Sequence, residues 1–207
     1  CTTPLGQVVG LVNGERIGTD ITPYWQPDRK IYKEAPTVPN VCRNVINRCY
    51  MNGRLWISDP DTHIARIDNN KLTKNEVELW TYALYLAGGM MLLSDRFETL
   101  TPERAELSKL LLSEPSIPDT RPLDVFDREF PAIWLRRDRD TGRLLAGLFN
   151  FEDEDRDLIL EFNRIQSGAK FTIKDFISKE TLEETDNKLL ITVAPHSCRI
   201  FELTSKA

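Results

Sequence analysis

Val12-Asn-Gly-Glu-Arg-Ile-Gly-Thr-Asp-Ile-Thr-Pro-Tyr-Trp25 is a segment in which two opposite charges stand close to a proline and two aromatic residues. We predict a short strand that ends near Arg16. Side chains of an extended chain alternate between its two faces. Arg16, Gly18 and Asp20 are therefore expected on one face, and Gly18 is expected to leave room for a ligand between the two charges.

Two interpretations of this segment compete. A fixed cation and a carboxylate at the end of a strand, followed at once by aromatic side chains, are the chemistry of a sugar-cleaving site. The alternative is a surface ion pair beside a turn, because most charged residues simply face solvent. The segment alone does not decide between them, so the rest of the chain must.

Length and composition limit the classes of protein to consider. The chain has 207 residues, of which 41% are hydrophobic and 29% charged, enough for a real core and for two domains. The net charge of −5 argues against a nucleic-acid partner, because there is no basic stripe to displace counterions from phosphates. No apolar run approaches the roughly 20 residues of a membrane span. We therefore expect neither nucleic acid nor a membrane as a partner.

Cysteine and histidine are too scattered to predict a metal site. The cysteines are Cys1, Cys42, Cys49 and Cys198, and the histidines are His63 and His196. Metal-ligand spacings such as C-x-x-C are missing, so no metal or other cofactor is expected. Cys42 and Cys49 would lie roughly 10 Å apart on a helix, too far to bridge. We interpret them as buried thiols of a reducing compartment, which favours the cytoplasm, although localisation itself is left open.

Residues 1–114 alternate short apolar strands with amphipathic helices. Helices are expected at residues 41–52, with Asn40 as the N-cap, and after the capping-box spacing Thr73-x-x-Glu76, with a stop at Gly88-Gly89. A third helix is expected to begin at Thr101-Pro102. Strands are expected at residues 54–58 and 90–95, the second buried on both faces. This βα repetition predicts parallel strands.

Acidic residues follow each of the expected strands, namely Asp20, then Asp59 and Asp61, then Asp95. The active site of a (β/α)₈ barrel is built at that end of its strands. We therefore predict the second half of a TIM-type barrel. A half barrel has exposed edges that need a cover. Because the chain starts at Cys1 without a Met, we expect a missing N-terminal part of the same protein as that cover, and a homo-oligomer is left open.

The pattern changes beyond residue 114. Residues 115–131 contain four prolines and little periodicity, which indicates a linker. Residues 132–207 contain six short strand-like runs separated by turn clusters, which predicts a C-terminal antiparallel β-sandwich. The runs are 132–137, 144–151, 158–162, 171–176, 189–193 and 198–203. The acidic run Glu152–Asp155 lacks the ligand spacing of a calcium loop and is interpreted as a solvated turn.

Several motifs resemble the second half of the α-galactosidases of glycoside hydrolase family 36, in the clan that also holds family 27. They are Cys1-x-x-Pro-Leu-Gly, the Arg16-Ile-Gly-Thr-Asp20 block with Pro23-Tyr-Trp25, Arg43-Asn44, Asn47-Arg48, Arg54-x-Trp56, Asp59-Pro-Asp61 and the closing Pro195-His-Ser-Cys-Arg-Ile-Phe-Glu-Leu203. The resemblance covers essentially the whole chain in order. It implies a (β/α)₈ barrel followed by a small β-sandwich.

The resemblance also implies roles for individual residues. Asp20 falls at the position of the general acid/base, and Arg16 at that of a substrate-binding arginine. Cys1 matches a cysteine that packs against the bound galactose, and Trp25 either lines the pocket or caps the barrel. Asp59 and Asp61 match an aspartate pair at the barrel rim, which either contacts sugar or orients the loops.

One departure from the family pattern is decisive. Retaining glycosidases need two carboxyl groups, and the family's nucleophile, an aspartate in a Lys-x-Asp setting, has no counterpart in this sequence. The resemblance thus implies the C-terminal part of a retaining, exo-acting enzyme that removes terminal α-D-galactose from its α-galactoside substrate. The chain by itself is expected to be inactive. The alternative is a non-catalytic carbohydrate-binding or assembly fragment.

Overall fold

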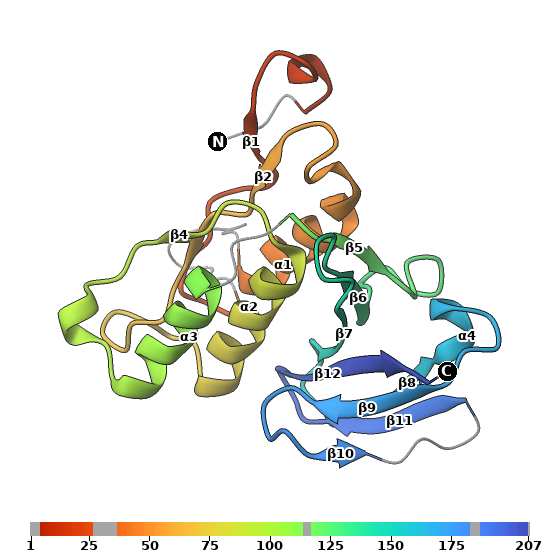
Figure 1. Ribbon diagram of the computed structural model, residues 1–207. Helices are drawn as coiled ribbons and strands as arrows, with labels where there is room; N and C mark the ends of the chain where they lie inside the picture. The colour runs from red at the N-terminus through yellow and green to blue at the C-terminus, as the bar shows by residue number, and fades with distance from the viewer. Residues whose placement is uncertain (1–4, 27–36, 114–116, 183–186, 207) are drawn as a thin grey trace. The chain divides into compact units, whose positions relative to one another are not determined.

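The computed structural model describes residues 5–26, 37–113, 117–182 and 187–206. The chain divides into two compact units, Cys1–Ile117 and Pro118–Ala207 (Figure 1). Unit 1 mixes helices with short parallel strands, and unit 2 is built mainly of antiparallel strands. Among the described residues, no helix is both long and apolar enough to cross a membrane.

Unit 1 contains two pairs of parallel strands, as the βα repetition predicts. Strand β1 (Gly14–Arg16) pairs with β2 (Ile57–Asp59), and β3 (Thr62–His63) pairs with β4 (Leu92–Leu93). The β1–β2 register sets Arg16 directly beside Asp59. Two residues far apart in the sequence thus meet at the carboxyl ends of neighbouring strands.

Three α-helices accompany these strands. They are α1 (Val38–Arg48), α2 (Lys74–Ala87) and α3 (Pro102–Ser113). Short 3₁₀ turns lie at η1 (Leu5–Val8), η2 (Cys49–Met51) and η3 (Phe97–Thr99). Helix α2 begins with the predicted capping box of Thr73 and Glu76 and ends at Gly88, whose φ of 66° suits glycine. Most of its side chains are buried, so it is a core helix rather than a one-sided surface helix.

Local predictions in unit 1 are wrong for three elements. The strand expected at residues 54–58 begins only at Ile57, because residues 54–55 form a turn. Helix α1 begins three residues earlier than expected, and Thr37, not Asn40, is its N-cap, with Thr37 Oγ1 accepting a hydrogen bond from the Asn40 amide. Proline suits the first turn of a helix, because the N–H that it lacks would have no partner there. The helix can therefore begin before Pro39 and include it. The apolar run 90–95 forms only the two-residue β4, and Leu92 is 41% exposed. Neither side chain of β4 is fully buried, so the strand is not covered on both faces as expected.

Unit 2 contains a six-stranded antiparallel sheet in the order β10-β9-β12-β7-β6-β5 and a separate antiparallel pair, β11-β8. Its strands are β5 (Asp119–Pro122), β6 (Ile133–Arg137), β7 (Leu144–Asn150), β8 (Arg156–Glu161), β9 (Phe171–Asp175), β10 (Thr181–Leu182), β11 (Lys188–Val193) and β12 (Ser197–Ser205). A short helix, α4 (Phe162–Ile165), follows β8. Each of the six predicted strand-like runs overlaps an observed strand.

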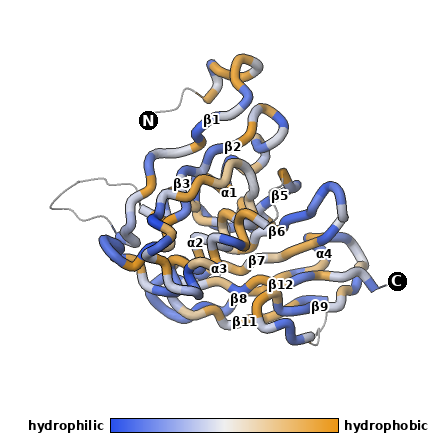
Figure 2. The backbone as a smooth tube through the Cα atoms, turned by 60° about the vertical axis from the view of Figure 1, so that its left-hand side comes forward, coloured by the Kyte–Doolittle hydropathy of each residue, from blue (hydrophilic) through white to orange (hydrophobic). Residues whose placement is uncertain are grey.

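One hydrophobic core joins the large sheet of unit 2 to the β8–β11 pair. Leu148 of β7, Leu160 of β8, Ile173 of β9 and Phe201 of β12 are all fully buried in it. Figure 2 shows the apolar character of β7, every residue of which is buried. In β8 and β9, buried and exposed residues alternate, which is the period-2 pattern of strands with one face on the core.

The segment predicted as a linker, residues 115–131, contributes to the sheet. Residues 119–122 form β5, which pairs with β6 at the edge of the sheet. Pro122 is compatible with this position, because an edge strand can dispense with one ladder hydrogen bond. Its proline content concealed the strand, since the same composition is typical of linkers.

Candidate functional site

Arg16 stands at the centre of a cluster of three carboxylates in unit 1. Its Nη1 lies 2.9 Å from Oδ1 of Asp20 and 3.1 Å from Oδ2 of Asp61, and its Nε lies 3.0 Å from Oδ2 of Asp59. The predicted site residues Arg16, Asp20, Asp59 and Asp61 are thus brought together. The ion pair expected between Arg16 and Asp20 is present, but it is one of three.

The pairing of two short strands builds this cluster. Arg16 and Asp59 are register partners at the ends of β1 and β2, and the Ile17 amide donates to the Asp59 carbonyl at 3.0 Å. Beyond β2 the chain turns sharply, and Asp61 adopts a left-handed φ of 78°, which aspartate tolerates better than most residues. Asp59 Oδ1 accepts a hydrogen bond from the Asp61 amide at 2.8 Å, so one carboxylate shapes the turn that positions the other.

Asp61 also anchors the segment that carries Asp20. Its Oδ2 accepts a hydrogen bond of 2.6 Å from the amide of Ile21, and its Oδ1 accepts one of 2.8 Å from the amide of Thr62. The side chains of Asp59 and Asp61 are 16% and 10% exposed, whereas that of Asp20 is 68% exposed. Asp59 and Asp61 thus both bind the backbone of the loops, and Asp20 is the most exposed of the three carboxylates.

The three carboxylates raise the pKa of Arg16. Burial lowers the pKa of Arg16, but the hydrogen bond to Asp59 and the charges of Asp59, Asp61 and Asp20 outweigh it, so its pKa is above the ordinary value. One guanidinium among three carboxylates leaves an excess of negative charge. The cluster therefore suits a ligand that offers hydroxyl donors better than an anionic one.

Gly18 has a different role from the one expected. A Cβ at this position would come within 3.2 Å of Asn44 Nδ2, so the space beside Gly18 is filled by helix α1 and does not receive a ligand. Arg48, from the same helix, donates from Nη1 to the carbonyl of Ile17. The sequence assigned no individual role to Asn44 or Arg48, although both lie in motifs that carry the family resemblance. Arg48 joins α1 to the strand end that carries the site, and Asn44 occupies the space beside Gly18.

The remaining predicted site residues are only partly placed. Cys1 lies outside the described residues. Trp25 is partly exposed, and the chain just before it is held by backbone hydrogen bonds, from Lys71 to the Pro23 carbonyl at 3.0 Å and from Val38 to the Tyr24 carbonyl at 3.1 Å. The structure therefore fixes the backbone before Trp25.

Asp95, the last acid expected at a strand end, has a structural role. Its side chain is 3% exposed and accepts hydrogen bonds from the amides of Ala65 and Arg66, at 2.5 and 3.0 Å, and from Arg66 Nη1 at 3.1 Å. These contacts use both of its oxygens to hold the chain after β3. Over the described ranges, no group of three or more His, Cys, Asp or Glu side chains is arranged to hold a metal ion.

Solved structures share this fold. A GH27 β-L-arabinopyranosidase from Geobacillus stearothermophilus superposes with a TM-score of 0.73 at 15% identity, over 97% of this chain and 47% of that one. A putative α-galactosidase from Bacteroides fragilis gives 0.72 at 16% identity, over 94% and 43%. α-Galactosidase I from Mortierella vinacea gives 0.72 at 13% identity, over 99% and 56%.

Each likeness covers only part of the matched structure. The chain spans about half the length of the structures it matches, and no protein-family model matches its sequence. At identities this low, the similarity concerns the fold. The chain therefore has the fold of part of an α-galactosidase-like glycosidase of the kind found in family 27 and its clan.

Proposed function

We propose that this chain supplies the acid/base side of the active site of a retaining, exo-acting glycosidase that removes terminal α-D-galactose. The observation that carries the proposal is the gathering of Arg16 and three carboxylates at the carboxyl ends of two parallel strands. In (β/α)₈ barrels, that end of the strands is the catalytic face. The fold shared with solved glycosidases supports this reading of the geometry.

In this proposal Asp20 is the general acid/base. It protonates the departing glycosidic oxygen and then takes a proton from the water that releases the sugar. An ion-paired carboxylate cannot deliver a proton, so Asp20 turns from Arg16 to the glycosidic oxygen when substrate binds. Its 68% exposed side chain has the freedom to do so, whereas Asp59 and Asp61 keep Arg16 in place. Arg16 then contacts the hydroxyls of the sugar.

The rest of the proposed site comes from other segments. A retaining mechanism needs a second carboxyl group roughly 5 Å from the first. We assign this nucleophile to residues that precede Cys1 in a longer protein, and Cys1 and Trp25 to the wall of the sugar pocket. Unit 1 is then the second half of a (β/α)₈ barrel, unit 2 its C-terminal β-sandwich, and the family is 36. The length of the matched structures supports this arrangement.

Substitution of Asp20 tests the acid/base role in the longer protein. For Asp20→Ala we expect kcat/KM on an alkyl α-galactoside to fall about 10²–10⁴-fold, the usual contribution of a general acid. An aryl α-galactoside with a nitrophenolate leaving group needs little protonation, so its kcat/KM should fall far less. Asp20→Asn is the matched control for shape and should behave like Asp20→Ala. Equal losses on the two substrates would contradict the assignment.

An assay of the 207-residue chain by itself tests the division of the site. Because the nucleophile is assigned to a preceding segment, we expect no turnover of nitrophenyl α-galactoside above that of an Asp20→Ala preparation. Clear turnover by the chain alone would show that its own residues complete the site and would refute the division.

A further inference from the structure

Helix α1 supports the short segment that joins Arg16 to Asp20. Arg48 is the last residue of this helix, and its Nη1 donates a hydrogen bond to the carbonyl of Ile17, the residue directly after Arg16. The amide of Ile17 donates to the Asp59 carbonyl at 3.0 Å. Both backbone polar groups of Ile17 are therefore occupied, its N–H by strand β2 and its C=O by helix α1.

A second residue of α1 supports the next position of the segment. A Cβ at Gly18 would lie 3.2 Å from Asn44 Nδ2 and 3.4 Å from Asn44 Cβ, so the backbone of Gly18 packs closely against Asn44. Asn44 precedes Arg48 by four residues, and side chains at that spacing lie on the same face of a helix. One face of α1 thus contacts both Ile17 and Gly18, which stand between Arg16 and the acidic end of the segment.

The far end of the segment is held as well. The amide of Ile21 donates a hydrogen bond of 2.6 Å to Oδ2 of Asp61. The backbone is therefore held on both sides of Asp20, whereas the side chain of Asp20 is 68% exposed. A fixed backbone with an exposed side chain suits the proposed mechanism, in which Asp20 turns from Arg16 to the glycosidic oxygen.

We propose that Arg48 is a positioning residue, which acts through the Ile17 carbonyl to orient the acid/base segment. This inference rests on the proposed function and deepens it. An acid/base group must lie within hydrogen-bond reach of the oxygen it protonates, and a misplacement of about 1 Å can lower the rate about 10²-fold. Two partly buried carboxylates of the cluster hold Arg16 from β2 and the turn after it. Loss of the Arg48 contact should therefore disturb proton transfer more than sugar binding.

Substitution of Arg48 in the longer protein tests this role. Arg48→Met keeps the aliphatic stem and removes the donor, so we expect kcat/KM on an alkyl α-galactoside to fall about 10- to 100-fold. On a nitrophenyl α-galactoside, whose leaving group needs little protonation, kcat/KM should fall far less, and the inhibition constant of galactose should not change. Arg48→Lys keeps a charged donor on a flexible stem and should recover most of the loss.

Two further variants separate orientation from general damage. Arg43→Met is the matched control, because it removes an exposed arginine from the same helix, and it should leave both values of kcat/KM unchanged. Gly18→Ala presses a methyl group against Asn44 and should cause the same selective loss, which keeps the test informative if Arg48→Met does not fold. Equal losses on the two substrates in these position-disturbing variants, or no recovery with Arg48→Lys, would overturn the proposal.

Nuclear magnetic resonance of the labelled 207-residue chain distinguishes failure of this inference from failure of the proposed function. A carbonyl that loses a hydrogen bond changes its ¹³C signal and the ¹⁵N signal of the next residue. Arg48→Met should therefore shift the Ile17 ¹³C and Gly18 ¹⁵N signals, and Arg43→Met should not. Unchanged signals would overturn the role of Arg48 alone. Shifted signals together with equal losses of Asp20→Ala on the two substrates would refute the acid/base function, and the orientation of an acid/base with it, while the contact itself would stand.

Discussion

At the scale of single residues, the difference between Asp20 and its two neighbours matters most. All three carboxylates contact Arg16, yet Asp59 and Asp61 also accept backbone hydrogen bonds that shape the loops, while Asp20 faces solvent. Unpairing partly buried carboxylates leaves charges that water cannot fully solvate. An exposed ion pair contributes little to stability, because solvent screens it.

Replacement of Arg16 should therefore destabilise unit 1, whereas replacement of Asp20 should not. For Arg16→Met we expect the free energy of unfolding to fall by about 2 kcal/mol, less than for a fully buried pair because the partners are partly exposed. For Asp20→Asn we expect a change within about 0.5 kcal/mol. Urea unfolding followed by tryptophan fluorescence measures both. If Asp20→Asn destabilised the protein as much as Arg16→Met, the assigned division of roles would be wrong.

His63 is a second polar side chain whose burial decides its role, and it lies outside the proposed site. It is 1% exposed, and its Nε2 lies 2.8 Å from Thr81 Oγ1. Thr81 donates its own proton to the Val77 carbonyl, so it must accept from Nε2–H, which leaves Nδ1 as the acceptor facing Ser108 Oγ at 3.4 Å. A neutral histidine thus links β3 to helices α2 and α3. Burial, with a smaller opposing effect of Asp95, lowers the pKa of His63 to about 4.

At the scale of elements, the helices with strong local signals form where the sequence predicts them. Helix α2 has both hydrogen bonds of the capping box, from the Glu76 amide to Thr73 Oγ1 at 3.3 Å and from the Thr73 amide to Glu76 Oε2 at 2.6 Å. The short strands behave differently. Strands of two or three residues have little intrinsic stability and exist because neighbouring segments provide partners.

Removal of the cap should weaken α2 measurably. For Thr73→Ala we expect a loss of about 1 kcal/mol, because the Glu76 amide loses its acceptor at the first turn. Lys74→Ala is the matched control, since Lys74 is exposed and its contact with Glu78 is long, at 3.7 Å. Its effect should stay within about 0.5 kcal/mol. Thermal unfolding by circular dichroism compares the two variants, and similar shifts in Tm would argue against the capping contribution.

At the scale of the whole molecule, each unit has its own group that is sensitive to acid. In unit 1, His63 is neutral when folded. In unit 2, Asp175 is 3% exposed and bonds to Arg199 at 2.6 Å. Burial raises the pKa of Asp175, but the hydrogen bonds from Ser178, Arg199 and Ile177 and the charge of Arg199 outweigh it, so its pKa is below the ordinary value. Acid therefore affects the two groups over different pH ranges.

Acidification should destabilise unit 1 before unit 2. The unfolded chain binds a proton at His63 below pH about 6.5, whereas the folded chain does so only near pH 4. The stability linked to this group is thus present above pH 6.5 and is lost, by at most about 3 kcal/mol, as the pH falls towards 4. The contribution of Asp175 is present above its unfolded value of 3.8 and is lost as the pH falls further, through its lowered folded pKa.

Hydrogen exchange at pH 7, 5 and 3.5 follows the two units separately. Peptides of α2 and α3 should lose protection at pH 5, while those of β9 and β12 keep it until lower pH. The variant His63→Gln can still donate to Thr81 but does not titrate, so its unit 1 should lose less stability between pH 7 and 5. Simultaneous loss of protection in both units above pH 4 would contradict the assignment to separate groups.

The sequence by itself determined features that depend on near neighbours in the chain. The capping box at Thr73, the helix start at Pro102 and the short strand-like runs of residues 132–207 follow from local patterns and capping chemistry, and the structure confirms them. The parallel pairing followed from the βα order. Local signals failed where partners were missing, as in the exposed β4, or where composition concealed a strand, as in β5.

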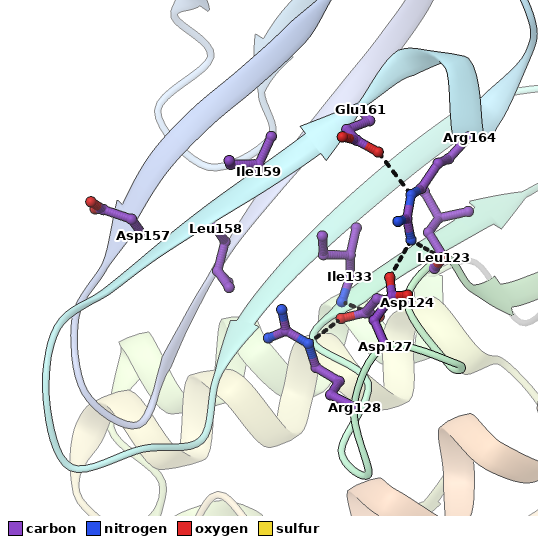
Figure 3. Close-up of a pocket in the computed structure, with 10 residues that line it drawn as sticks. All are labelled: Leu123, Asp124, Asp127, Arg128, Ile133, Asp157, Leu158, Ile159, Glu161 and Arg164. Carbon is purple, nitrogen blue, oxygen red and sulfur yellow. Dashed lines mark hydrogen bonds and ion pairs between the residues drawn. The ribbon is translucent and has the colours of Figure 1, made fainter.

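Only the tertiary structure decided which side chains meet. Residues 16 and 59 are 43 positions apart, and the periodicity of the sequence does not predict that strand pairing places them side by side. The sequence likewise gave no sign that Arg164 would bond to Leu123 and Asp127 (Figure 3), because residues 115–131 were taken for a linker. Helices and caps are encoded by residues within a few positions of one another. The Arg16 cluster and the contacts of Arg164 arise from long-range packing, which the sequence encodes only through the fold as a whole.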